Sequence, residues 1–376
     1  MQSVFDRIVK LRNGAPFIID RHNSNRYRFV VYENDGSKTA YYFSAPIYHH
    51  KSRKLVDLQF HRSEDGFCTA GSNADITISQ NITLENAVGF CVLDLPQKPV
   101  LLSSREICCG SNTLMPTTNG IAMKCRINER EKVSLTATVS NPFLNVMAND
   151  KCLAFMQEQF TPFVVFSCIG SVDGTGNVIA PAQLEYQKLT DKKYQLTISS
   201  TSPQAQFVLL ECNLYENKLF QDTTVESMHP ASNNAFGSVG FIGHTSLCGE
   251  QWLYSRLDHT RMPELMDRCI HKAVLHIPKL NRNNTELCVF NVASRFCSFG
   301  SNWDNKIADS AWIADSVSNG RYQSLDLTTL LVDQRTGNLK RSEGFILKPK
   351  HRQAEFSAIT TADSSFAPQI LEIQFR

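Results

Sequence analysis

The amino-acid sequence predicts an all-β protein, in which a C-terminal jelly-roll β-sandwich is preceded by one or two smaller antiparallel β domains. Short segments of alternating apolar and polar residues recur along the chain, and turn-forming residues separate them. Helical segments do not alternate with these strands, so a parallel sheet is not indicated. The 376 residues are enough for two or three domains of ordinary size. We place the domains at residues 1–130, 131–216 and 217–376.

The first domain contains a clear hairpin signal. Tyr27 to Glu33 is a run of β-forming residues, and Thr39 to Phe43 is the expected return strand. Asn34-Asp-Gly36 lies between them and suits a tight turn, because Asp and Gly tolerate the positive φ that such turns require. Three further segments alternate with a period of two and predict strands: residues 55–60, 75–79 and 89–95.

The second domain reads as a small sandwich. Val133 to Ser140 alternates, and Pro162 to Ile169 is a continuous apolar run that is typical of a central strand. Lys151 to Gln159 predicts the one short helix of this part. Three more strands are expected at residues 184–189, 194–199 and 207–215.

The third domain has the densest strand pattern. At least seven candidates are spread evenly over about 160 residues, which is why we expect a jelly roll there. They are residues 238–243, 251–256, 272–277, 287–293, 322–327, 344–348 and 370–375.

Composition and charge exclude several classes of function. A net charge of +2 provides no polybasic surface, so nucleic acid is not an expected partner. No apolar run approaches the ~20 residues that cross a bilayer, so membrane insertion is not expected. Met1 to Lys10 has no apolar core after a basic start and is unlike a signal peptide. This predicts a cytoplasmic protein or one that is exported without a leader.

The twelve cysteines are predicted to be reduced thiols. A chain of this size does not need disulfides for stability, and no leader directs it to an oxidising compartment. Several of them stand where a small apolar residue would stand in a strand, namely Cys91, Cys168, Cys212 and Cys288.

Several phrases of residues 217–376, taken in order, resemble the DNRLRE-type domain. This is a bacterial jelly roll related to alginate-binding carbohydrate-binding modules and to disaggregatase-related domains. The matching phrases are Asp222-Thr-Thr-Val225, Pro230, Asn234-Ala-Phe-Gly237, Phe241-Ile-Gly243, Tyr254-Ser-Arg256, Trp303-Asp-Asn305, Asp326-Leu-Thr328, and the segments that begin at Gly344 and Pro368.

The resemblance implies an extracellular or cell-surface protein, which stands against the absence of a visible leader. It covers roughly 40% of the chain, a typical domain's length. The chain departs from the family after Arg256, where Leu257 to Pro263 intervenes before any leucine-rich phrase. Because of this departure, a sugar site of the family cannot be carried over to Arg256 from the resemblance alone.

A glycan site is predicted around Trp303, together with Asp304, Asn305 and Lys306. Aromatic faces stack on the C–H patches of sugar rings, and polar neighbours fix the hydroxyl groups. The alternative for Trp303 is a core tryptophan with a satisfied indole N–H, and this alternative is stronger for Trp252. Cations that would meet uronate carboxylates are Arg256, Lys306, Arg321 and Lys348; their alternative is a solvated surface.

The resemblance also implies a structural Ca²⁺ near the start of the third domain. Asp222, Glu226 and Asn234 are oxygen donors in a segment expected to form a loop, and Asp363 lies in a last loop that returns to the same edge. The alternative is that these side chains cap turns.

We therefore expect a non-catalytic binding or assembly protein whose partner is a polysaccharide or other protein subunits. Two alternatives stay open: a structural component of a phage-like or cell-surface assembly, and a glycan-cleaving lyase or hydrolase. The sequence contains no Gly-x-Ser-x-Gly, P-loop or His-Glu-x-x-His motif, and no two acids are marked as a catalytic pair.

Overall fold

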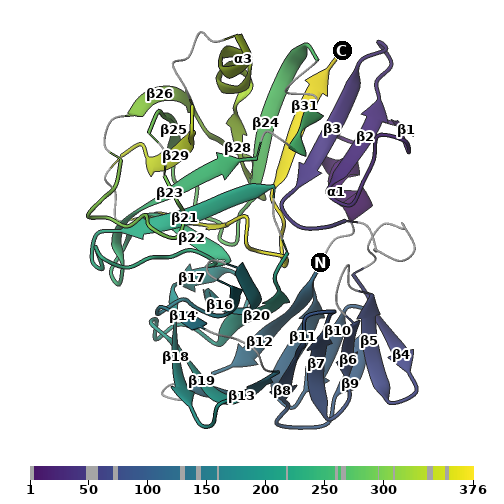
Figure 1. Cartoon of the computed structure of the whole chain (residues 1–376), viewed down its shortest axis with the longest axis vertical. Coiled ribbons are helices and arrows are strands. Elements are labelled where there is room, and N and C mark those ends of the chain that lie inside the picture. Colours follow the sequence, from purple (N-terminus) through teal and green to yellow (C-terminus); the bar gives the residue numbers. More distant parts are fainter. Residues whose placement is uncertain are drawn as a thin grey trace. The chain divides into compact units, whose positions relative to one another are not determined.

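The computed structural model describes residues 4–47, 58–70, 75–127, 132–140, 145–158, 161–216, 219–258, 261–263, 268–294, 296–307, 310–336, 342–351 and 355–376 (Figure 1). Antiparallel strands make up almost all of its regular structure, which confirms the all-β prediction. The helices seen there are α1 (Val4–Leu11) and α3 (Thr328–Thr336). In the described part of the chain, no helix has the length and apolar character of a membrane span.

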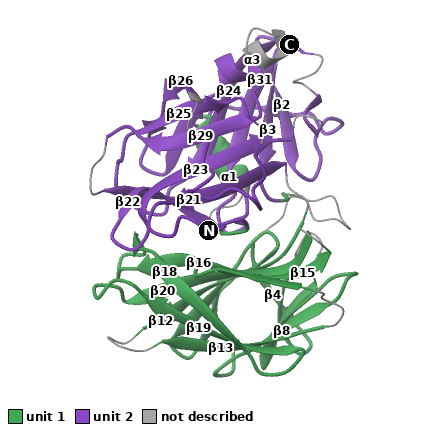
Figure 2. Ribbon diagram, turned by 60° about the vertical axis from the view of Figure 1, so that its left-hand side comes forward, with its two compact units in different colours: residues 1–13, 46–217, 236–238 green, residues 14–45, 218–235, 239–376 purple. Residues whose placement is uncertain are grey.

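The chain forms two compact units, which Figure 2 shows in different colours. Unit 1 comprises Met1–Asn13, Pro46–Asn217 and Phe236–Ser238. Unit 2 comprises Gly14–Ala45, Lys218–Ala235 and Val239–Arg376. The prediction divided the chain at residues 130 and 216, whereas the units are assembled from segments that are far apart in sequence.

Unit 1 is built from two antiparallel sheets. One has the order β14-β15-β16-β20-β12-β11-β10-β9, with β17 on β16, and the other has the order β18-β19-β13-β8-β7-β6-β5-β4. The first contains β9 (Val100–Ser103), β10 (Glu106–Cys109), β11 (Asn112–Pro116), β12 (Gly120–Arg126), β14 (Asn145–Ala148), β15 (Cys152–Glu158), β16 (Thr161–Val172), β17 (Val178–Ala180) and β20 (Phe207–Leu214). The second contains β4 (Phe60–Ser63), β5 (Gly66–Ala70), β6 (Asp75–Ile78), β7 (Asn81–Glu85), β8 (Phe90–Asp94), β13 (Val133–Val139), β18 (Ala182–Lys188) and β19 (Lys193–Ser200).

The two sheets of unit 1 share one apolar core. Ile82 and Leu84 of one sheet lie in the same buried cluster as Ile121 and Phe166 of the other. Strands from both sides of the predicted boundary at residue 130 belong to these sheets, since β13 pairs with β8 and β20 pairs with β12. The pairing makes residues 58–216 one sandwich rather than two domains.

Two predictions within unit 1 have opposite outcomes. The apolar run at Pro162–Ile169 is the centre of β16, which is paired with β15 and β20, as expected for a central strand. The helix expected at Lys151–Gln159 is wrong, because Cys152–Glu158 is strand β15. Five consecutive buried residues give this segment no exposed helical face, and pairing with β14 and β16 fixes it as a strand.

Unit 2 is a sandwich of two further sheets. The β31 sheet has the order β1-β2-β3-β31-β24-β28-β27, and the β29 sheet has the order β26-β25-β29-β23-β22-β30, with β21 on β23. The β31 sheet contains β1 (Ile18–Ile19), β2 (Arg28–Tyr32), β3 (Lys38–Phe43), β24 (Ile270–Pro278), β27 (Val317–Ser318), β28 (Tyr322–Asp326) and β31 (Ile370–Phe375). The β29 sheet contains β21 (Phe220–Glu226), β22 (Val239–Thr245), β23 (Gly249–Leu257), β25 (Leu287–Val292), β26 (Ser310–Asp315), β29 (Gly344–Pro349) and β30 (Phe356–Thr360).

Eight strands of unit 2 have jelly-roll topology. Taken in chain order they are β3, β23, β24, β25, β26, β28, β29 and β31, and they form the half-sheets β3-β31-β24-β28 and β26-β25-β29-β23. The chain crosses between the two half-sheets at every step except from β25 to β26, as in a jelly roll. The first of the eight strands lies at residues 38–43, far outside the predicted domain at 217–376.

The predicted hairpin of residues 27–43 therefore completes the C-terminal sandwich. β2 and β3 pair around a turn in which Gly36 has a φ of 80°, as the Asp-Gly signal indicated. β3 then pairs with β31 from Lys38↔Phe375 to Phe43↔Ile370. Ala40 and Tyr42 join Leu275 of the β31 sheet and Leu347 of the β29 sheet in the core.

Candidate functional site

The outer surface of the β29 sheet carries a set of aromatic and cationic side chains. Leu253, Val289 and Leu347 point into the core of unit 2. Their neighbours on the same three strands, Trp252, Phe290 and Lys348, therefore point to the opposite surface, because side chains alternate along a strand.

These outward side chains form a continuous series of contacts. Lys348 Nζ lies 4.1 Å from the ring centroid of Trp252 and 4.8 Å from that of Phe290. The rings of Trp252 and Trp303 have their centroids 4.9 Å apart at an interplanar angle of 51°. Lys306 Nζ lies 4.4 Å from the Trp303 centroid. Cations at these distances are attracted by the ring faces.

Trp312 extends the series at the edge strand β26. It is the register partner of Phe290, and residues directly opposite each other share one face of a sheet. Its side chain is 61% exposed, whereas Trp252, Phe290 and Trp303 are half-buried. We call the set Trp252, Phe290, Trp303, Lys306, Trp312 and Lys348 the aromatic face.

A short loop holds Trp303 against the sheet. Asn302 and Asn305 bond each other reciprocally, each backbone N–H donating to the other's side-chain oxygen, at 2.8 and 3.0 Å. Asn305 also donates from Nδ2 to the carbonyl of Gly300 (2.7 Å), and the Tyr254 hydroxyl donates to the carbonyl of Ile307 (3.2 Å). These bonds hold the loop on both sides of Trp303, and the Asn305 side chain stabilises the loop conformation.

Carboxylates border the aromatic face. Glu250 Oε1 accepts a hydrogen bond from Trp252 Nε1 (2.9 Å), so the buried indole N–H is satisfied. Asp315 accepts from Trp312 Nε1 (3.2 Å) and pairs with Lys350 (2.6 Å). Hydrogen bonds from Lys350, Cys288 and Trp312 lower the pKa of Asp315, so it stays an anion.

Lys348 is the most desolvated cation of the face. Burial lowers the pKa of its ammonium group; the charge of Lys306 lowers this pKa further, and that of Glu250 raises it. An anionic group of a ligand placed beside the Lys348 ammonium group would stabilise its charged form and so offset the cost of desolvation.

The structure brings together most, but not all, of the predicted glycan-site residues. Trp303 and Lys306 belong to the aromatic face, and Asp304 and Asn305 lie in the same loop with exposed side chains. Arg256 is exposed and shares its side of β23 with Trp252, four residues away.

Arg321 is placed elsewhere. It precedes β28 in the β31 sheet, and its carbonyl accepts a hydrogen bond from the backbone N–H of Lys279. Sequence reasoning missed Phe290 and Trp312 as members of the face. The alternation of side chains predicts on which side of its own strand each residue lies. Whether Phe290 and Trp312 lie on the same surface of the sheet depends on the register of β25 with β26.

The four residues predicted to hold calcium do not share a loop. Asp222 and Glu226 belong to strand β21, where the extended backbone places their Cα atoms about 13 Å apart. Glu226 Oε1 lies 3.1 Å from His229 Nδ1, and its Oε2 accepts from Gln251 Nε2 at 3.1 Å. One ion with ligands at about 2.3–2.6 Å does not fit this spacing and these partners. The loop that the prediction assumed is absent for Asp222 and Glu226 because strand pairing with β23 extends the chain there.

Asn234 and Asp363 likewise have local contacts. The buried Asn234 donates from Nδ2 to the carbonyl of Thr224 (3.1 Å). The backbone N–H of Asp363 donates to Thr361 Oγ1 (3.1 Å). Neither bond is a turn cap by the residue's own side chain, because Asn234 bonds to a carbonyl of strand β21 and Asp363 takes part through its backbone N–H.

Asp222 is a buried acid in an unusual setting. Its Oδ2 accepts from the N–H of Ala362 (2.8 Å) and from Gln369 Nε2 (2.9 Å), while Oδ1 is buried without a hydrogen-bond partner among the described residues. Desolvation raises the pKa of Asp222 to about 6, against the lowering effect of the hydrogen bonds from Ala362 and Gln369. The carboxyl group therefore gains its proton near pH 6, well above the ordinary range of an aspartate.

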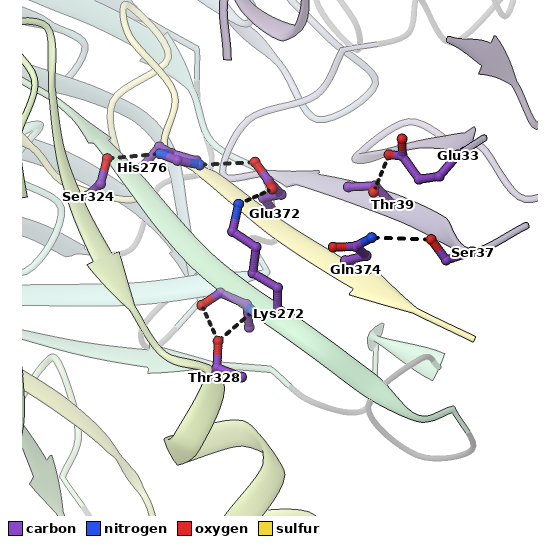
Figure 3. A network of polar contacts seen from close by, with 10 residues as sticks. Glu33, Ser37, Thr39, Lys272, His276, Ser324, Thr328, Glu372 and Gln374 are labelled. Carbon is purple, nitrogen blue, oxygen red and sulfur yellow. Dashed lines mark hydrogen bonds and ion pairs between the residues drawn. The ribbon is translucent and has the colours of Figure 1, made fainter. Parts of the chain in front are cut away.

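A polar network crosses three strands on the outer surface of the β31 sheet (Figure 3). His276 Nδ1 lies 3.0 Å from Ser324 Oγ, and its Nε2 lies 3.3 Å from Glu372 Oε2. Lys272 Nζ donates to Glu372 Oε1 at 2.8 Å. Burial raises the pKa of Glu372, but the hydrogen bonds from His276 and Lys272 outweigh burial and hold this pKa below its ordinary value.

Serine, histidine and glutamate are the residue types of a nucleophilic triad. Residue types alone do not distinguish a catalytic triad from a structural network, so the surroundings of Ser324 must be considered. A triad also requires backbone N–H groups that are available to a developing oxyanion. Ser324 lies in β28, which is paired with β24 on one side and with β27 on the other. Because the ladder engages the backbone there, we assign the network the role of fastening β28, β24 and β31 side by side.

The cysteines agree with the sequence interpretation. All twelve lie within the described residues as thiols, and Cys91, Cys168, Cys212 and Cys288 are buried. Burial raises the pKa of the Cys125 thiol to about 12 and that of Cys288 to about 11, so neither is an activated nucleophile.

Neither the models of protein families nor the curated protein sequences contain a match to this chain.

Proposed function

We propose that the protein is a non-catalytic binding protein and that the aromatic face of unit 2 binds a polysaccharide carrying carboxylate groups. The observation that carries the proposal is the series of contacts from Phe290 through Lys348, Trp252 and Trp303 to Lys306, with Trp312 as the register partner of Phe290 on the same surface. The resemblance of the C-terminal region to DNRLRE-type domains and alginate-binding modules points to the same class of ligand.

The chemistry of the face suits an acidic sugar chain. The exposed ring of Trp312 would stack on the apolar side of a pyranose ring, and a rigid aromatic side chain loses little entropy on binding. The ammonium groups of Lys306 and Lys348 lie over the rings of Trp303 and Trp252 at 4.4 and 4.1 Å, and they would bind carboxylates of a sugar chain that stacks on Trp312. A surface on which several aromatic and cationic side chains follow one another suits an extended chain rather than a single buried ring.

Trp312→Ala is the sharpest test, because its exposed side chain makes the substitution mild for folding. We expect this change to weaken binding to alginate or pectate about tenfold to thirtyfold, as for the loss of one aromatic hot-spot contact. Retardation in native gels that contain the polysaccharide measures the effect. Tyr186→Ala, an exposed aromatic residue of unit 1, is the matched control and should leave retardation unchanged.

The acidic character of the ligand is tested by Lys348→Gln. This change should weaken binding to alginate or pectate and leave any binding to a neutral glucan unaltered, because it removes charge and keeps most of the side-chain stem. If the wild-type protein binds none of the acidic polysaccharides, or if Trp312→Ala and Trp303→Ala bind as well as the wild type, the proposal is wrong. A role in a phage-like or cell-surface assembly would then be the better explanation.

A further inference from the structure

Cationic residues make up half of the lining of a pocket at one end of the unit 2 sandwich. The cavity has a volume of about 270 Å³. Arg28, Lys38, Arg268 and Arg376 contribute to its wall, and Phe375 adds an aromatic ring. None of these residues belongs to the aromatic face.

The strand register explains why charged side chains meet there. Lys38 is on the same side of β3 as Ala40, and Arg28 is on the same side of β2 as Val30, and both of these partners are core residues. Lys38 is the register partner of Phe375, the last residue of β31. Lys38 and Phe375 thus lie side by side where the apolar inner face ends, while Arg28, the register partner of Tyr42, reaches the pocket from farther along β2.

Neighbouring groups hold two of these side chains in place. Lys38 Nζ pairs with the buried Asp20 at 2.7 Å and lies 4.6 Å from the ring centroid of Tyr32. The hydrogen bond to Asp20 raises the pKa of Lys38, although burial opposes this effect, so the side chain stays charged. Arg28 Nε donates to the carbonyl of Asn23 at 2.7 Å.

Arg376 and Arg268 complete the basic wall. Arg376 donates from NH2 to the carbonyl of Asp35 (2.9 Å) and lies 3.7 Å from its carboxylate. The side chain of Arg268 is exposed. Asp20 and Asp35 thus set two negative charges against the four cations, which leaves this set with a positive excess.

We infer that this pocket binds a small molecule through an oxyanion group, either a sugar acid or a phosphorylated sugar. Guanidinium groups match the planar or tetrahedral oxygens of carboxylate and phosphate, and a lysine supplies a point charge beside them. The Phe375 ring offers an apolar surface for the body of the ligand. A volume of about 270 Å³ is just below the range of drug-sized pockets, so it suits one sugar unit rather than a chain. The inference is independent of the polysaccharide site proposed above.

The test uses the full-length protein in isothermal titration calorimetry at constant ionic strength, with glucuronate, inorganic phosphate and glucose as separate probes. We expect saturable binding of glucuronate or phosphate and no heat of binding from glucose. Saturation by glucuronate alone would assign a sugar acid, and saturation by phosphate alone would assign a phosphorylated ligand; either supports the site.

Two substitutions locate the binding. Arg268→Gln and Arg376→Gln change exposed side chains and should each raise the Kd at least fivefold. Arg62→Gln on the exposed surface of unit 1 is the matched control and should leave the Kd unchanged. Trp312→Ala should also leave it unchanged, which separates this pocket from the aromatic face. The inference is overturned if neither anion saturates the protein, or if both pocket variants bind as tightly as the wild type.

Discussion

Residues 219–376 expressed alone are expected not to fold, although the sequence pattern predicts a domain with nearly the same bounds, residues 217–376. The fragment lacks β3, so β31 would lose one of its two neighbours, together with the pairs from Lys38↔Phe375 to Phe43↔Ile370. It would also lose Val30, Ala40 and Tyr42 from the core. Removing one large core side chain costs about 2–5 kcal/mol, and a domain's entire stability is about 5–15 kcal/mol.

Near-ultraviolet circular dichroism and thermal unfolding would measure this effect. The control is a fusion in which residues 14–45 are joined to residues 219–376 by a flexible Gly/Ser linker of about 20 residues. The fusion restores all eight jelly-roll strands and should unfold cooperatively. A cooperative transition of the fragment alone at the temperature of the fusion would contradict the assignment of β3 to unit 2.

Asp222→Asn is expected to stabilise the protein at pH 8, by up to about 3 kcal/mol. The pKa of Asp222 rises from 3.8 to about 6 in the folded state, chiefly because burial disfavours the charged form. Each unit of pKa difference corresponds to about 1.4 kcal/mol. An asparagine keeps an oxygen for the N–H groups of Ala362 and Gln369 and carries no charge.

The pH dependence has a definite sign. The folded state binds the Asp222 proton more tightly than the unfolded state does, so the stabilising contribution of this proton is complete below about pH 4 and is lost as the pH rises through 6. The advantage of Asp222→Asn over the wild type should therefore shrink between pH 6 and pH 4. Urea denaturation at pH 4, 6 and 8 measures it, with the exposed Asp304→Asn as the control that should show no such trend.

The Asp222→Asn variant also tests whether Asp222 is a calcium ligand. If Asp222 were a calcium ligand, calcium would stabilise the wild type, EDTA would reverse the effect, and Asp222→Asn would be the less stable protein at pH 8. That outcome would refute the assignment of Asp222 as a buried acid.

Sequence reasoning succeeded where a local pattern decides the structure. The β2–β3 hairpin follows from β-forming residues around Asp35-Gly36, where Gly36 has the positive φ that a tight turn requires. The central strand β16 follows from the apolar run at Pro162–Ile169. It failed at Lys151–Gln159, where the local signal was ambiguous and the pairing of β15 with β14 and β16 decided the outcome.

The candidate site was predicted in part for the same reason. Trp303 and Lys306 are neighbours in sequence and could be proposed together, whereas Trp252, Phe290 and Lys348 come from three strands that only the sheet register aligns. Arg321 was grouped with them by residue type, but it lies in the other sheet of unit 2.

The amino-acid sequence by itself determined the all-β class, the positions of about half of the strands, and the buried thiols. Each of these depends on the alternation or apolar character of a few adjacent residues. Only the tertiary structure decided that residues 38–43 pair with residues 370–375, although residues 46–217, which lie between them in the sequence, belong to unit 1. It also decided that the aromatic face and the basic pocket exist. Pairing between strands more than 300 residues apart depends on complementary surfaces that no local pattern encodes.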